Sequence, residues 1–319
     1  NFYDLNKVSN ILDLDNYTDG DKSVFTINGK LNAIPISNTG RVFCWNKTTF
    51  DKIGVEIPTT LDELLAAGKA FEAYDESYYP MVTKELDRAF LMVYYLQCKY
   101  GKDWVKDGAL QYSQEEIAEG FDFLKNLEDN HVIPTLQKVA GDGSDLIDTN
   151  ANWIDGHYAG IFLYDTSVVK HAEAVKDGEF VIGDYIKMGD YHGGFIKVNQ
   201  AFGISATTEH PAEAAALIQF LVAEEDGVKT LGDTRGVPAN KAGLSMLDLS
   251  GSQVAEANAK VMEWSSFQMD PTFERSSFTG ADGTFFNALQ LSSYGESDSM
   301  SCAKIVEDGV ANELSSTGL

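Results

Sequence analysis

Three polar side chains lie close to the points where we expect the chain to cross between two halves of a fold. The first point is expected near Pro35 and the second near Gly194, and Asn38 and Arg41 lie beside the first. Arg41 is one of only four arginines in a chain with twenty lysines, and its planar guanidinium can form paired hydrogen bonds. His192 directly precedes Gly193-Gly194 near the second point. These residues are candidates for contact with a bound molecule; a structural ion pair is the alternative for Arg41, and an incidental surface position is the alternative for His192.

The sequence contains none of the common short motifs that indicate a catalytic site. H-E-x-x-H, G-x-S-x-G, G-x-x-x-x-G-K-[ST] and a G-x-G-x-x-G after a strand are all missing, so nothing nominates a nucleophile. Asp15, Asp19 and Gly20 imitate part of a calcium-binding loop, but Tyr17 occupies a ligand position and Thr26 replaces the closing glutamate. We therefore expect no enzyme activity, no cofactor and no metal.

Length and charge narrow the class of protein. A chain of 319 residues exceeds the usual size of one core, so we expect two lobes with a cleft between them. The sequence has 24 basic and 49 acidic residues. The resulting net charge of −25 excludes nucleic acid and anionic lipid as partners. No apolar run approaches the ~18 residues that span a bilayer.

The cysteines do not form a disulfide framework. Cys44, Cys98 and Cys302 are odd in number, lack a C-x-x-C pair and lie in apolar or helical contexts, so we expect buried thiols. A disulfide between two of them stays open. The first residues, Asn-Phe-Tyr-Asp, have neither the basic start nor the apolar stretch of an export signal.

The hydrophobic pattern predicts strands alternating with helices, and hence an α/β fold. Residues 24–36 read as two short strands joined by Asn28-Gly29, with Pro35 ending or edging the second. Further strands are expected at 41–45, 158–164, 180–186 and 195–205, and helices behind the capping pairs Thr60/Glu63 and Ser113/Glu116, at 86–100 and from Pro211. Trp45 and Trp153 lie in or beside predicted buried elements, so we expect both in the core.

Several of these segments occur in the order found in one family. The hairpin Asn28-Gly29-Lys30 leads into Ala33-Ile34-Pro35, and the chain continues with Val42-Phe43-Cys44-Trp45-Asn46-Lys47, the stretch 50–63, Trp153 to Ile161, Gly193-Gly194, Phe202 to Ser205, Pro211 to Glu225 and Gly236-Val237-Pro238-Ala239. Together they resemble the family 1 extracellular solute-binding proteins, relatives of the maltodextrin-binding protein that serve ABC-type sugar importers. The resemblance covers nearly the whole chain.

The resemblance implies a two-lobed periplasmic-binding-protein-like fold of class II. Relatives open with further strand and helix units, so we expect part of the first lobe to be missing from this chain. The implied organisation is a remnant of lobe 1 in residues 1–37, lobe 2 in 38–194, a return to lobe 1 in 195–270 and C-terminal helices in 271–319 that pack at the hinge and on lobe 2.

The resemblance also implies candidate site residues. Tyr164 and Asp165 match a strand end that faces the cleft, where an aromatic platform and a hydroxyl acceptor are needed. Arg88 matches the start of a helix at the cleft rim, and Phe286 matches a late helix that can present a stacking aromatic. The alternatives are that Asp165 caps the following helix, that Arg88 is structural and that one of the adjacent phenylalanines 285 and 286 lies in the core.

The implied function is extracytoplasmic binding of an oligosaccharide by a monomer that delivers it to the permease of an ABC importer, from the periplasm or as a cell-surface lipoprotein. A carbohydrate-active hydrolase is one alternative, because two carboxylates across a cleft can cleave a sugar. A binding protein for another solute, such as a polyamine or a peptide, is the second.

Overall fold

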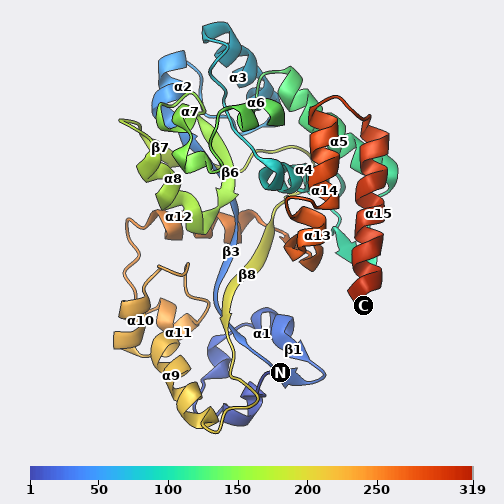
Figure 1. Cartoon of the computed structure of the whole chain (residues 1–319). Helices are drawn as coiled ribbons and strands as arrows, with labels where there is room; N and C mark the ends of the chain where they lie inside the picture. The colour runs from blue at the N-terminus through green and yellow to red at the C-terminus, as the bar shows by residue number, and fades with distance from the viewer. Residues whose placement is uncertain (318–319) are drawn as a thin grey trace. The chain divides into compact units, whose positions relative to one another are not determined.

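The computed structural model describes residues 1–317 and separates into two compact units (Figure 1). Unit 1 comprises Asn1–Gly40 and Ile196–Ala259, and unit 2 comprises Arg41–Phe195 and Lys260–Leu319. Residues 260–270, which the sequence places with the first lobe, thus fall in unit 2. The reason is local pairing: the backbone N–H of Phe267 donates to the Gly194 carbonyl at 3.2 Å, and the Lys260 ammonium pairs with Asp184.

Unit 1 is built from short elements around a small aliphatic core. Its core holds Leu5, Ile34, Ile204 and Ile218, all buried. The elements are the 3₁₀ helices η1 (Leu5–Val8) and η2 (Leu14–Asn16), the helices α1 (Asp19–Phe25), α9 (Pro211–Ala223), α10 (Glu225–Leu231) and α11 (Lys241–Leu244), the beginning of α12 (Gln253–Trp264), and the strands β1 (Thr26–Ile27), β2 (Lys30–Leu31), the first part of β3 (Ile34–Asn46) and β8 (Phe195–Phe202).

The first hairpin is shorter than the sequence predicts. Asn28 and Gly29 do form its turn with positive φ angles, but each strand has only two residues. Val24 belongs to α1 instead, because Thr18 and Asp21 form a capping box that starts a helix there. Pro35 does not end a strand; it is the second residue of β3 and lies opposite Ala201 of β8.

The strand β3 is the longest in the structure's described part, with 13 residues, and it contributes to both units. In unit 1 it pairs antiparallel with β8, from Ile34 opposite Phe202 to Gly40 opposite Ile196. In unit 2 it pairs antiparallel with β6 (Gly160–Tyr164) and β7 (Phe180–Ile182). This register places Arg41 opposite Tyr164 at one end of the β6 ladder.

Unit 2 carries most of the helices. Besides β6, β7 and the rest of β3, its elements are α2 (Lys47–Ile53), α3 (Leu61–Tyr74), α4 (Glu85–Tyr100), β4 (Val105–Lys106), β5 (Ala109–Leu110), α5 (Gln114–Asp129), α6 (Leu136–Gly141), η3 (Ile147–Thr149), α7 (Ala151–Ile154), η4 (Asp165–Ser167), α8 (Val168–Ala174), β9 (Phe267–Gln268), η5 (Pro271–Glu274), α13 (Ser276–Thr279), α14 (Thr284–Ser293) and α15 (Ser299–Thr317). Both predicted capping boxes are present, at the starts of α3 and α5.

Aromatic rings fill the core of unit 2 around β3. The Phe43 ring stacks on Phe162 with centroids 4.5 Å apart and meets Tyr94 edge-on at 5.5 Å. Trp45 is fully buried, as the sequence predicts for it and for Trp153. Gly160, at the start of β6, must lack a side chain, because a Cβ atom there would lie 2.3 Å from the Trp45 ring. The core thus fixes β6 against β3 by ring packing.

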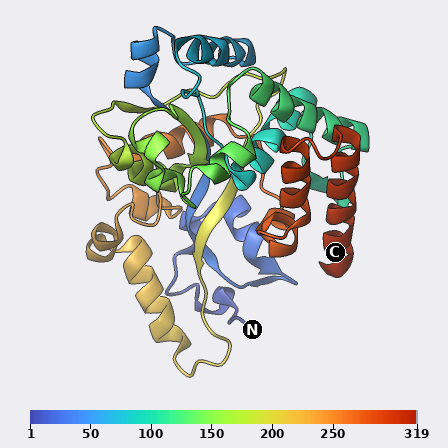
Figure 2. The same ribbon diagram turned by 45° about the horizontal axis from the view of Figure 1, so that its top comes forward.

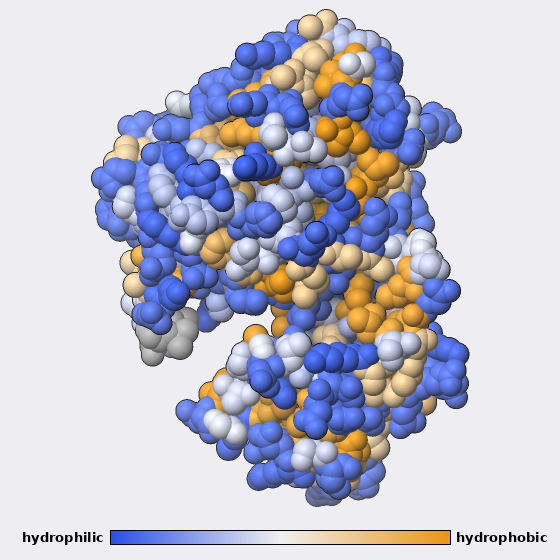
Figure 3. Space-filling view, turned by 180° about the vertical axis from the view of Figure 1, so that it is seen from behind, coloured by the Kyte–Doolittle hydropathy of each residue, from blue (hydrophilic) through white to orange (hydrophobic). Residues whose placement is uncertain are grey.

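The C-terminal helices form a layer within unit 2. The helix α15 packs along α5 and α14, and α14 and α5 both contact α4; Figures 1 and 2 show α5, α14 and α15 side by side. No helix in residues 1–317 is both long and apolar enough to span a bilayer. The face drawn in Figure 3 is coloured mostly as hydrophilic, in line with the excess of charged residues.

Candidate functional site

Arg41 lies in an aromatic and acidic environment at the end of the β3–β6 ladder. The side chain is 3% exposed, and its Nη2 atom donates to the Asp87 carboxylate and to the Phe162 carbonyl at 2.6 Å. The guanidinium carbon lies 4.8 Å from the centroid of the Tyr164 ring and 5.1 Å from that of Phe90. The ion pair considered as the alternative for Arg41 is therefore present. The charged group fixes the orientation of the Tyr164 ring by a cation–π contact.

Tyr164 and Asp165 differ in what they offer. Tyr164 is half-buried, and its hydroxyl lies 3.9 Å from the Met269 sulfur. Burial raises the pKa of Tyr164 to about 12, so the phenol stays neutral and keeps its proton for donation. Asp165 is fully buried, and its Oδ1 accepts a hydrogen bond from the Thr166 backbone N–H at 2.7 Å. The carboxylate thus holds the turn that follows β6, but it does not cap a helix, because the N-cap positions of η4 and α8 are Tyr164 and Ser167.

Asn38 is half-buried in unit 1, where a bulge in β3 precedes it. Its Nδ2 donates to Asp21 Oδ1 at 2.9 Å, and its backbone carbonyl accepts from Asn258 Nδ2 at 3.0 Å. The first of these bonds orients the side-chain amide, and the second fixes the backbone. Asn38 is therefore a preorganised polar group of unit 1.

Arg88, which the resemblance places at a cleft rim, is buried inside unit 2. It is 1% exposed, its Nη1 forms an ion pair with Glu128, and its Nη2 donates to the Pro134 carbonyl at 2.5 Å. Glu128 also accepts from the Ser293 hydroxyl at 2.5 Å, which ties α5 to α14. Arg88 is thus enclosed by unit 2 itself, in line with the structural role considered as its alternative.

His192 and Phe286 keep accessible surface. His192 is exposed, and its ring stacks on Trp264 with centroids 3.8 Å apart and planes 8° apart. The Trp264 ring also stacks on Tyr185 at 5.2 Å. Phe286 is half-buried, whereas the neighbouring Phe285 is fully buried, so one of the two phenylalanines does belong to the core.

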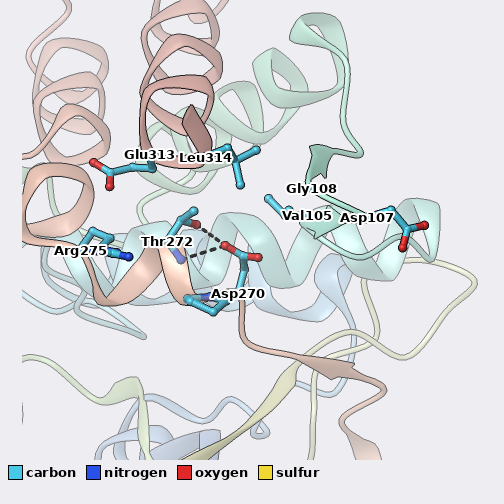
Figure 4. Close-up of a pocket in the computed structure, with 9 residues that line it drawn as sticks. Val105, Asp107, Gly108, Asp270, Thr272, Arg275, Glu313 and Leu314 are labelled. Carbon is cyan, nitrogen blue, oxygen red and sulfur yellow. Dashed lines mark hydrogen bonds between the residues drawn. The ribbon is translucent and has the colours of Figure 1, made fainter. Parts of the chain in front are cut away.

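Unit 2 also contains a cavity of about 410 Å³ that the sequence did not indicate (Figure 4). We call it the η5 cavity. It is lined by Val105, Asp107, Gly108, Asp270, Pro271, Thr272, Arg275, Glu313 and Leu314. The lining comes from the β4–β5 hairpin, the η5 segment and the end of α15, which are far apart in the sequence.

Asp270 is the polar centre of this cavity. One of its carboxylate oxygens, Oδ1, accepts from the Thr272 backbone N–H at 2.9 Å and from the Thr272 hydroxyl at 2.5 Å. In Figure 4, Arg275 and Glu313 lie to one side of Asp270, Asp107 lies to the other, and the Val105 and Leu314 side chains lie between them. The scarcity of arginine that drew attention to Arg41 applies equally to Arg275, but the sequence did not reveal which arginines are exposed.

A second, smaller cavity of about 230 Å³ lies beside the Trp264 stack. Its lining consists of Asp184, Tyr185, Lys260, Glu263 and Trp264. Since the Lys260 ammonium pairs with Asp184, the charges of this cavity are partly compensated.

The side chains at these places can make several kinds of non-covalent contact with a ligand. Carboxylates, a guanidinium, phenols and ring faces can accept and donate hydrogen bonds and can pack on the apolar face of a ligand. Within residues 1–317 no group of three or more His, Cys, Asp or Glu side chains is arranged to hold a metal ion. The arrangement is thus suited to binding a polar molecule.

The sequence and structure place the chain in a known family. Residues 1–251 match the sequence model of the bacterial extracellular solute-binding proteins. The chain is 31% identical to a periplasmic solute binding protein from Pectobacterium atrosepticum, over 98% of this chain and 80% of that one, with a TM-score of 0.90. The protein belongs to the bacterial extracellular solute-binding proteins, and it has the mixed α/β periplasmic-binding-protein fold that the sequence predicts.

Two further solved structures are similar. One is a periplasmic oligogalacturonide binding protein from Yersinia enterocolitica, solved in complex with saturated digalacturonic acid, at 31% identity over 98% of this chain and 80% of that one, with a TM-score of 0.87. The other is a de novo designed cysteine esterase, at 30% identity over 99% of this chain and 80% of that one, with a TM-score of 0.88. The family places the protein outside the cytoplasm, as the sequence predicts.

Proposed function

We propose that this protein binds an oligosaccharide outside the cytoplasmic membrane and presents it to the permease of an ABC importer. The observation that carries the proposal is the likeness to the Yersinia enterocolitica oligogalacturonide binding protein, at 31% identity over 98% of the chain. Sugars are held by ring faces and by planar hydrogen-bonding groups, and unit 2 offers both kinds of group near Arg41 and Tyr164.

The two units would act as the two lobes of the binding protein. Residues 1–37 and 195–270 would supply lobe 1, residues 38–194 lobe 2 and residues 271–319 the helices that pack at the hinge and on lobe 2. The two compact units support a division close to this one, with Asn1–Gly40 and Ile196–Ala259 in the first unit. A ligand that contacts both lobes favours only their closed arrangement, so closure would signal occupancy to the permease. We further propose that the protein is a monomer and, in a source without an outer membrane, a lipid-anchored one.

For the ligand contacts we retain Asn38, Tyr164, His192 and Phe286 as candidates. Each of the four keeps some exposed surface in its own unit. Arg41 and Asp165 would support these residues without touching the ligand. Arg41 orients the Tyr164 ring, and Asp165 holds the turn that follows Tyr164. Arg88 is left out because it is enclosed.

The three cysteine thiols do not favour a catalytic role for this protein. The esterase among the similar structures is a designed cysteine enzyme. Here Cys44, Cys98 and Cys302 are all 0% exposed, and burial raises the pKa of the Cys98 and Cys302 thiols. A catalytic thiolate needs a lowered pKa and access to substrate. The resemblance to that esterase therefore concerns the scaffold.

The test is isothermal titration calorimetry of the chain with neutral oligosaccharides, oligogalacturonides, polyamines and short peptides, combined with a product assay for each sugar. We expect heat of binding for an oligosaccharide, a matching rise in melting temperature and no product, because a ligand that binds only the folded state stabilises it. Binding of a polyamine or peptide alone, or release of cleaved sugar, would refute the proposal.

A further inference from the structure

The size and walls of the η5 cavity can accommodate a saccharide unit. Its volume of about 410 Å³ lies in the range of ~300–1,000 Å³ typical of small-molecule sites. Apolar side chains from three segments, Val105, Pro271 and Leu314, form much of its wall. A sugar ring presents C–H groups on its faces and hydroxyls at its edge, so an aliphatic wall with a few convergent polar groups suits it.

Two polar groups of the cavity keep hydrogen-bonding capacity. Asp270 uses Oδ1 for its bonds to Thr272, and its Oδ2 forms no hydrogen bond within residues 1–317. The exposed side chain of Arg275 forms no hydrogen bond or ion pair with another residue in that range. A carboxylate oxygen accepts from a hydroxyl, and a guanidinium donates to a hydroxyl or a ring oxygen. The pair can therefore hold both kinds of edge group that a sugar carries.

The charges of the cavity discriminate between sugars. Among the lining residues that the structure describes, Asp107, Asp270 and Glu313 supply three carboxylates and Arg275 is the single cationic side chain. Glu313 accepts a hydrogen bond from the Ser277 hydroxyl. A net formal charge of about −2 repels a further carboxylate by ~tenfold in binding constant even at the dielectric of water. A uronic acid unit is thus disfavoured at this place, and a neutral unit is not.

We infer that the η5 cavity is a subsite for a neutral sugar unit of the bound oligosaccharide, with Asp270 accepting from its hydroxyls and Arg275 donating to its oxygens. The inference rests on the proposed function, because it names part of the ligand of the same protein. The inference adds a requirement that does not follow from the similarity to the family. The bound oligosaccharide should contain a neutral sugar unit, even if another of its units is a uronate.

The test compares two disaccharides with the same linkage, α-1,4-galactobiose and α-1,4-digalacturonic acid, by calorimetry and by NMR of the Val105 and Leu314 methyl groups. We expect galactobiose to shift both methyl signals and to bind at least ~tenfold more tightly at this place than digalacturonic acid. Asp270→Asn retains a side chain that can cap η5 but removes the charge, so it should weaken galactobiose by about tenfold and narrow the gap to digalacturonic acid.

Arg275→Ala should weaken both sugars by about tenfold, whereas Lys125→Ala, which removes an exposed cation of α5 outside the cavity, should leave both unchanged. If sugars bind the wild type but neither methyl signal moves and both cavity variants bind like the wild type, the subsite is refuted while the proposed function stands. If no sugar of either series binds at all, the proposed function fails, and the subsite fails with it.

Discussion

The buried ion pair between Arg88 and Glu128 gives the sharpest test of how unit 2 is held together. The two side chains are 2% and 5% exposed, and Glu128 also accepts from Ser293 of α14. We consider the substitution Glu128→Ala, which removes the carboxylate and leaves the Arg88 guanidinium in place. The remaining partner of Arg88 is then the Pro134 carbonyl, which carries no full charge.

The expected loss of stability follows from burial. Removing one partner of a buried pair leaves an uncompensated charge and costs about 3–5 kcal/mol. For a unit of this size that corresponds to a fall in melting temperature of roughly 6–20 °C. The double variant Arg88→Met with Glu128→Leu removes both charges and fills the space with apolar atoms, so it should recover most of the loss.

The assay uses the distribution of tryptophan. All four tryptophans, at positions 45, 104, 153 and 264, belong to unit 2, so intrinsic fluorescence reports the unfolding of that unit. Urea titrations of the wild type, Glu128→Ala and the double variant give the free energies of unfolding. A matched control is Asp129→Ala, which removes an exposed carboxylate next to Glu128 and should cost less than ~1 kcal/mol.

Two results would refute this reasoning. Glu128→Ala within about 1 kcal/mol of the wild type would mean that the Arg88 charge is compensated elsewhere. A double variant as unstable as Glu128→Ala would mean that the loss comes from the packing of α5 on α14 and not from the uncompensated charge.

Three further outcomes are expected. Gly160→Ala should destabilise unit 2 by about 3 kcal/mol in urea titrations, because its Cβ would overlap the Trp45 ring, whereas Gly141→Ala, with open space around it, should be neutral or slightly stabilising. Burial raises the pKa of Tyr17 to about 12, so the unfolded chain loses this proton at a lower pH than the folded chain does. The free energy of unfolding should therefore fall between pH 10 and 12, and Tyr17→Phe should make the corresponding fall in the urea midpoint smaller. The three buried thiols should resist a thiol reagent in the folded chain and react after denaturation; reaction of the native protein would show that the cysteines are accessible.

Short sequence motifs predict several elements of the fold correctly. The capping pairs Thr60/Glu63 and Ser113/Glu116 mark the starts of α3 and α5 correctly, because a capping box depends on four consecutive residues only. A further capping box begins at Thr18, where an aspartate takes the place of the usual glutamate, and the sequence pattern does not reveal it. Val24 and Phe25, the last two residues of α1, are therefore predicted as part of the first strand of the hairpin.

The side chains of the candidate site were harder to predict, because burial is a property of the whole fold. Arg88 follows a helix start, and only the tertiary structure shows that Glu128 and Pro134 enclose it. Arg275 stands in an unremarkable segment, and only the meeting of η5, the β4–β5 hairpin and α15 gives it a cavity. Sequence periodicity reports which face of an element is apolar and does not report which distant segments meet there.

The discontinuity of unit 1 has a consequence for biosynthesis. Its two segments, Asn1–Gly40 and Ile196–Ala259, are separated by residues 41–195, which belong to unit 2. The first part of β3 finds its partner β8 only after that long insertion has been made. During translation Leu5 and Ile34 are therefore made long before Ile204 and Ile218, with which they share a core, and they stay unpacked until the intervening part has been synthesised.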